Sequence, residues 1–328
     1  MKTRTPPKLR KGDTIRVIAP ANSMSGISKS ILQLAEKRFQ KMGIKVTYSA
    51  HARERNHLST SSVEARLHDL HEAFEDEEVN GILAADGGYA SNSLLHRIEW
   101  KTIRHHPKIF GGYSDITAMQ NAILAQTGII TYSGPLFSNF GQKKHFDYTL
   151  DYFKKCVMHE KPFSVTPATH WSNDNWYTHQ DQRKQVLNKG WTLIQEGTAT
   201  GTIVGGNLST LKSLFGTDYF PSLRNTILFI EDDYESKKVH FDRDFQSLLH
   251  QREFKGVKGV VIGRFEHKSK ITDEDIHHMI HSRKELETIP VISHVDFGHT
   301  DPMITFPIGG TAHITAAKKQ STIRIIRH

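Results

Sequence analysis

The chain has 328 residues, and its 43 Lys and Arg against 35 Asp and Glu give a net charge of +8. This length suggests two domains, and a hydrophobic content of 37% is too high for a chain that is disordered throughout. The single cysteine, Cys156, excludes an intramolecular disulfide and any multi-cysteine zinc or redox centre.

Strands and helices are expected to alternate along the first half of the chain. Short apolar runs predict strands at 15–19, 44–48, 81–85, 108–110 and 129–132. Apolar residues at helical spacing predict helices over 28–42, 61–74 and 115–126. This alternation is typical of a mainly parallel sheet with helices on both faces, so the predicted fold class is α/β.

A polar stretch over about 162–189 separates the two halves, and it holds Trp171 and Trp176, two of the four tryptophans. An ordinary solvated linker is not expected to carry paired tryptophans. The second half predicts strands at 227–230, 257–262, 291–292, 303–306 and 323–326, and helices at 239–250 and 273–286. We therefore predict an N-terminal α/β domain over 1–160, a Trp-bearing linker or excursion over 161–190, and a C-terminal β-rich α/β domain over 191–328.

The positive charge is scattered in short pairs such as Lys154-Lys155, so a nucleic-acid partner is not expected. A modest positive potential suits a small anionic substrate instead. No apolar run reaches the roughly 18 residues of a membrane span, and no apolar segment of a signal peptide follows the first residues. We expect a soluble cytoplasmic protein without membrane contacts.

The segment Gly111-Gly112-Tyr113-Ser114-Asp115 runs from a predicted strand directly into a predicted helix. A serine at such a turn lies near the positive end of the helix dipole and beside free backbone N–H groups, as a serine nucleophile requires. The alternative is that Ser114 only caps the helix, which serine does often. The segment is not a G-x-S-x-G elbow, which disfavours an ordinary α/β-hydrolase.

Other polar groups follow predicted strands or lie in loops. Paired glycines at Gly87-Gly88 allow a close backbone approach and a second oxyanion donor, and the alternative is a tight turn. Glu231 ends an apolar strand in a carboxylate cluster, which solvated acids after a strand would explain equally well, and His299 lies in a Gly/Pro-bounded loop. The sequence shows no H-E-x-x-H metal motif and no G-x-G-x-x-G dinucleotide motif, so no metal or cofactor is expected.

Taken together, these segments and Gly205-Gly206-Asn207-Leu208 resemble the serine peptidases of the L,D-carboxypeptidase family (peptidase family S66), over residues 12–310. The resemblance implies Ser114 as nucleophile, His299 as base and Glu231 as the residue that orients it. It also implies an oxyanion hole formed by the N–H groups of Gly88 and Asp115, a substrate contact from Asn207, and a homodimer.

The Trp-bearing excursion and the segment 87–92 look like the microcin C7 immunity branch of this family. Trp171 and Trp176 are then expected to stack on a purine base, although they could equally pack the two domains together. The branch implies hydrolysis of the amide bond of peptidyl- or aminoacyl-nucleotides, in self-immunity. The alternatives are a murein tetrapeptide L,D-carboxypeptidase in cell-wall recycling and, in another class, a non-catalytic binding protein for small anions.

Overall fold

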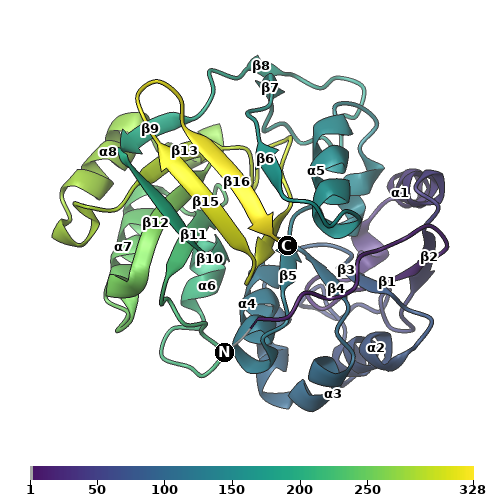
Figure 1. The fold of residues 1–328 in the computed structure, drawn as a ribbon. Helices are drawn as coiled ribbons and strands as arrows, with labels where there is room; N and C mark the ends of the chain where they lie inside the picture. Colours follow the sequence, from purple (N-terminus) through teal and green to yellow (C-terminus); the bar gives the residue numbers. More distant parts are fainter. Residues whose placement is uncertain (1–2) are drawn as a thin grey trace.

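The computed structural model describes residues 3–328, which form two sheet-based lobes side by side (Figure 1). The first lobe is built on a six-stranded sheet in the order β14-β5-β4-β3-β1-β2. Its strands are β1 (Thr14–Ile18), β2 (Lys45–Tyr48), β3 (Gly81–Ala84), β4 (Ile109–Gly112), β5 (Thr131–Ser133) and β14 (Phe306–Ile308). Its helices are α1 (Lys29–Lys41), α2 (Val63–Glu75), α3 (Trp100–His105), α4 (Ile116–Thr127) and α5 (Asp147–Val157).

Helices cover both faces of the first sheet, and each face has its own buried core. Residues of α2, α3 and α4 pack on one face of the sheet, while residues of α1 and α5 pack on the other. Helix α1 shows how the sequence produces this layer: the Ser28 hydroxyl accepts the Ile31 N–H at its start, and Leu32, Ala35 and Phe39 form a buried stripe at helical spacing. The predicted α/β class is confirmed.

The second lobe is built on an eight-stranded sheet in the order β6-β16-β15-β10-β11-β12-β13-β9. Its strands are β6 (Phe163–Val165), β9 (Thr192–Gln195), β10 (Gly197–Asn207), β11 (Thr226–Glu231), β12 (Val257–Gly263), β13 (Val291–Val295), β15 (Thr311–Ala316) and β16 (Thr322–Arg327). Its helices are α6 (Leu208–Lys212), α7 (Lys238–Leu249) and α8 (Asp273–His281). A small two-stranded sheet, β7 (His170–Trp171) with β8 (Val186–Leu187), lies in the excursion.

Three sequence predictions need correction. The long strand β10 was not predicted, because its glycines and threonines give no continuous apolar run. The helix predicted over 273–286 ends at His281, and a separate 3₁₀ turn follows at Lys284–Leu286. The strand predicted at 303–306 shares only Phe306 with β14 (Phe306–Ile308), which pairs with β5 of the first sheet and not with the second sheet. The predicted domain boundaries, 1–160 and 191–328, stay a prediction.

Parallel pairing brings the site residues to one edge of each sheet. Strands β1, β3, β4 and β5 run parallel in the first sheet, and β10, β11, β12 and β13 run parallel in the second. The carboxyl ends of parallel strands meet at the same edge of a sheet. Because the chain leaves β13 for β14, the loop that holds His299 passes from the second sheet to the first.

Gly205 in β10 offers a stability test of this sheet. Its φ is +136°, and a Cβ there would lie 2.1 Å from the carbonyl oxygen of Phe229 in β11. We expect Gly205→Ala to lower the free energy of unfolding by about 3 kcal/mol or more, measured by urea denaturation. The control Gly216→Ala has φ +76° but open space around its Cβ, and should cost about 1 kcal/mol. Equal losses in the two variants would contradict the steric account.

Within residues 3–328, no helix combines the length and the apolar character needed to span a membrane.

Candidate active site

Ser114 lies in the sharp turn between β4 and α4, with the left-handed φ of +63°. The residue at the start of α4 is Asp115, and its side chain makes no capping bond. The Ser114 hydroxyl does not cap the helix either, since its oxygen lies 3.1 Å from Nε2 of His299. The turn therefore presents the hydroxyl to an imidazole, which is the arrangement of a nucleophile and its base.

A buried carboxylate completes this hydrogen-bond chain. Nδ1 of His299 lies 2.7 Å from Oε2 of Glu231, which ends β11 and is 2% exposed. A carboxylate only accepts hydrogen bonds, so Nδ1 donates to Glu231 and Nε2 is left to accept the Ser114 hydroxyl. Gly298 makes room for this carboxylate: a Cβ at that position would lie 2.4 Å from Oε2 of Glu231.

The surrounding charges decide the protonation of His299. Burial lowers the pKa of the imidazole, but the carboxylate of Glu231, with further contributions from Asp233 and Glu266, raises the pKa to about 9. The neutral form needed to accept a proton from Ser114 is therefore present mainly at alkaline pH in the free protein. The imidazolium formed when His299 takes that proton is strongly favoured by the same carboxylates.

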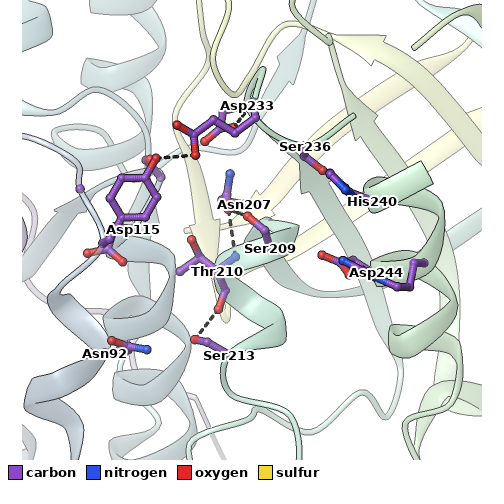
Figure 2. Close-up of a pocket in the computed structure, with 15 residues that line it drawn as sticks. Asn92, Asp115, Asn207, Ser209, Thr210, Ser213, Asp233, Ser236, His240 and Asp244 are labelled. Carbon is purple, nitrogen blue, oxygen red and sulfur yellow. Dashed lines mark hydrogen bonds and ion pairs between the residues drawn. The ribbon is translucent and has the colours of Figure 1, made fainter. Parts of the chain in front are cut away.

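Both predicted oxyanion donors line the same cavity as Ser114. The cavity has a volume of about 380 Å³ and lies between the lobes, with Gly88 and Asp115 on the first lobe. Figure 2 shows Asp115 on one side and Asn207 and Asp233 on the other. Gly88 has φ +145°, and Asn22 occupies the place of a Cβ, 2.7 Å away, so only glycine fits this position.

Asn207 is held by the second lobe at the point where β10 turns into α6. Its side-chain oxygen accepts the Thr210 N–H at 3.0 Å, and its amide donates to Oδ1 of Asp232 at 3.0 Å. Burial, together with the charges of Glu231 and Asp233, raises the pKa of Asp232 to about 7. Asn207 lines the cavity beside Ser114, as its predicted contact with substrate requires.

The two tryptophans of the excursion are not brought into this cavity. Trp171 is 9% exposed, with its ring 5.0 Å from the Arg264 guanidinium and 4.8 Å from the His267 ring. Trp176 packs near Tyr177, with ring centroids 5.9 Å apart. Both partners of Trp171 belong to the second lobe, so these contacts do not show its ring packing the two domains together, and stacking on a ligand stays a prediction for both residues.

Sequence reasoning missed a contact across the cavity between Tyr89 and Glu235. The Tyr89 hydroxyl donates to Oε2 of Glu235 at 2.7 Å, which joins the glycine loop of the first lobe to the carboxylate segment of the second. Both residues adjoin motifs that were singled out, Gly87-Gly88 and Glu231, but nothing in the sequence indicates that the two loops meet.

Metal-binding potential lies elsewhere. Within the described part of the chain, 3–328, one group of His, Cys, Asp or Glu side chains has the spacing to hold a metal ion: His51, His68 and Asp69. These residues come from the loop after β2 and from α2, and none of them lines the cavity at Ser114. The Ser114–His299–Glu231 chain therefore stands apart from them.

Two family models match the chain, one for each lobe. The LD-carboxypeptidase N-terminal domain matches residues 15–134, and the LD-carboxypeptidase C-terminal domain matches residues 200–314. YocD of Bacillus subtilis, which is named as a carboxypeptidase, is 48% identical over 98% of this chain and 99% of its own. The chain belongs to the LD-carboxypeptidase family. Membership makes this protein a serine-type peptidase, which removes the non-catalytic binding protein as an alternative.

Solved structures of this peptidase family share the whole fold. An MccF-like protein from Bacillus anthracis superposes with a TM-score of 0.98 and 48% identity, covering 99% of this chain and 100% of its own. MccF, the microcin C7 self-immunity protein of Escherichia coli, was solved in complex with glutamyl sulfamoyl guanosine. That structure superposes with a TM-score of 0.89 and 27% identity, over 98% of both chains.

Proposed function

We propose that this peptidase hydrolyses an amide bond through Ser114, His299 and Glu231. The observation that carries the proposal is the continuous hydrogen-bond chain from the Ser114 hydroxyl through the imidazole to the buried Glu231 carboxylate. It joins a residue of the first lobe to two residues of the second, so both lobes must be folded for the site to exist. An isolated lobe should therefore be inactive.

In this mechanism, Nε2 of His299 takes the proton of the Ser114 hydroxyl as Oγ attacks the amide carbonyl carbon. The carbonyl oxygen becomes an oxyanion, which the backbone N–H groups of Gly88 and Asp115 stabilise. His299 then gives the proton to the leaving nitrogen, and the C–N bond breaks to leave an ester on Ser114. Water, deprotonated by His299, cleaves that ester and restores the hydroxyl.

We propose a peptidyl- or aminoacyl-nucleotide as the substrate. The proposal is supported by the likeness of the whole chain to MccF, whose structures hold glutamyl sulfamoyl guanosine and aspartyl sulfamoyl adenosine. The cavity of about 380 Å³ beside Ser114 has hydroxyl and carboxylate groups on its wall, which can bind the polar part of such a molecule. Self-protection against a microcin-type nucleotide would be the consequence.

A comparison of two substrates tests this choice. Purified protein with EDTA present is given an aminoacyl sulfamoyl adenosine and, separately, a murein tetrapeptide, and the products are followed by mass spectrometry. We expect kcat/KM to favour the nucleotide by about 100-fold or more, the discrimination expected when a site makes polar contacts that the second substrate leaves unpaired. The Ser114→Ala protein serves as the blank for contaminating hydrolases.

The second candidate function is that of a murein tetrapeptide L,D-carboxypeptidase. It is favoured by the family description and by the carboxypeptidase name of YocD, which is more similar in sequence to this chain than MccF is. Turnover of the tetrapeptide alone would establish this candidate and overturn the nucleotide substrate. A homodimer and a cytoplasmic location also remain proposals, which sedimentation and cell fractionation would test.

A further inference from the structure

Helix α2 carries a buried arginine toward the loops on the first-lobe side of the cavity. Arg66 is 5% exposed, and its Nη1 donates to two carbonyl oxygens, those of Pro20 and Ala90, each at 2.8 Å. Its Nη2 donates to the Ser93 hydroxyl at 3.2 Å. One guanidinium therefore joins the loop after β1 to the loop after β3.

The partners of this cation are neutral oxygens. Among residues 3–328, no carboxylate forms an ion pair with Arg66, although Arg16 on the neighbouring strand pairs with both Glu72 and Asp76. Burial lowers the pKa of Arg66, and the more distant charge of Asp115 partly opposes this effect. A buried charge costs free energy unless it is paired or hydrogen-bonded. Because both hydrogen bonds of Nη1 go to loop oxygens, we look for the role of Arg66 in holding these loops.

The first loop that Arg66 holds supports Gly88. Pro20 lies two residues before Asn22, whose N–H donates to the Gly87 carbonyl at 3.0 Å. The Asn22 side chain lies against Gly88, at the place where a Cβ would be. Ala90, the other carbonyl partner, follows Gly88 by two residues. Arg66 thus fixes the glycine loop from both sides.

The second loop connects the same guanidinium to Asp115. Ser91 begins the 3₁₀ helix η2 (Ser91–Arg97), directly after Ala90. Its N–H donates to Oδ2 of Asp115 at 2.8 Å, and its hydroxyl donates to the Asp115 carbonyl at 2.7 Å. Ser91 is fully buried, so these bonds are shielded from water. A continuous path therefore runs from Arg66 through Ala90 and Ser91 to Asp115, the residue that follows Ser114.

We propose that Arg66 is the positioning residue of the oxyanion hole, an inference that rests on the proposed function. Arg66 does not touch the reacting atoms. Through Ala90 and Ser91 it sets the distance between the Gly88 and Asp115 N–H groups, and its charge favours the negative charge that develops between them. N–H donors that are fixed before the reaction stabilise the transition state more than the ground state. We therefore expect the loss of Arg66 to lower kcat and to leave KM nearly unchanged.

The test measures steady-state kinetics of Arg66→Gln and Arg66→Lys on whichever of the two substrates the wild type cleaves. We expect kcat of Arg66→Gln to fall by about 100-fold, the scale of losing one oxyanion donor, with KM within about threefold. Arg66→Lys should recover part of the loss, because an ammonium can still donate to the Ala90 carbonyl. The rate at which a fluorophosphonate labels Ser114 should fall in parallel with kcat.

Two further variants separate positioning from folding. Arg16→Gln removes the arginine that pairs with Glu72 and Asp76 of α2, so it should lower the melting temperature but keep kcat. Ser91→Ala deletes only the hydroxyl that binds the Asp115 carbonyl, and kcat should fall by about tenfold, the cost of one buried hydrogen bond.

The positioning role is wrong if folded Arg66→Gln and Ser91→Ala both keep the kcat of the wild type, or if their losses lie in KM alone. It is equally wrong if Arg16→Gln loses as much kcat as Arg66→Gln. Failure of the proposed function looks different, because Ser114→Ala would then retain activity. Loss of activity in Ser114→Ala with none in the Arg66 variants would leave the serine mechanism intact and remove only the role of Arg66.

Discussion

Ser114→Ala is expected to lower kcat/KM by about 10⁴-fold or more, the loss seen when a serine peptidase loses its nucleophile and only the oxyanion hole and binding remain. The reason is specific to this turn: Oγ of Ser114 faces Nε2 of His299 at 3.1 Å, and no other hydroxyl of residues 3–328 is hydrogen-bonded to this nitrogen. The measurement is the rate at which the purified variant hydrolyses the substrate that the wild type cleaves, and the stability of the variant is followed by thermal denaturation.

The matched control is Ser133→Ala, which removes another buried serine, at the end of the neighbouring strand β5. Its activity should stay close to that of the wild type. Alanine at position 114 keeps the left-handed φ of +63° that serine already has, so the melting temperature of Ser114→Ala should change little. Hydrolysis at the rate of the wild type by folded Ser114→Ala would remove Ser114 as the nucleophile.

Strand ends made the residues of this site predictable from the sequence. Ser114, Gly88 and Glu231 each follow a short apolar run that is a strand in the structure, β4, β3 and β11. Local patterns of this kind report where a chain leaves a sheet, and parallel strands bring those points together. The fourth strand end, that of β10 at Asn207, was singled out only by the family resemblance, because β10 itself lacks a recognisable apolar pattern.

Contacts between distant segments could not be predicted in the same way. Tyr89 meets Glu235 across 146 positions of sequence, and Arg66 reaches Pro20 and Ala90 from the first turn of α2. The pattern of α2 predicts only a helix with one buried face, on which an arginine would normally be placed outside. The burial of Arg66 is explained by the loops that surround it, and the sequence pattern of α2 carries no information about those loops.

The contacts of Trp171 and Trp176 with distant segments could not be predicted from the sequence either. Within residues 161–190, β6 pairs with β16 and Trp171 is buried. Composition could not say which surface each ring covers. An aromatic ring suits a purine and an arginine guanidinium equally well, and the structure places the guanidinium of Arg264 on Trp171.

Glu231→Gln is expected to lower kcat/KM by about 10⁴-fold, the loss that follows when the acidic member of such a triad becomes an amide. The carboxylate accepts Nδ1–H of His299 at 2.7 Å, which leaves Nε2 free to accept the Ser114 proton. The amide N–H of glutamine can instead donate to Nδ1, which moves the imidazole proton to Nε2 and blocks the base. The measurement is kcat/KM across pH with the substrate that the wild type cleaves.

The pH profile adds an independent readout. With the pKa of His299 raised to about 9, the kcat/KM of the wild type should increase with pH until about that value, because the base must be neutral. Glu231→Gln removes the main charge that raises this pKa, so its residual activity should reach its plateau at lower pH. Glu266→Gln, which removes a weaker contribution, should keep most of the activity and shift the profile less. A profile of Glu231→Gln that coincides with that of the wild type would show that Glu231 does not set the protonation of the base.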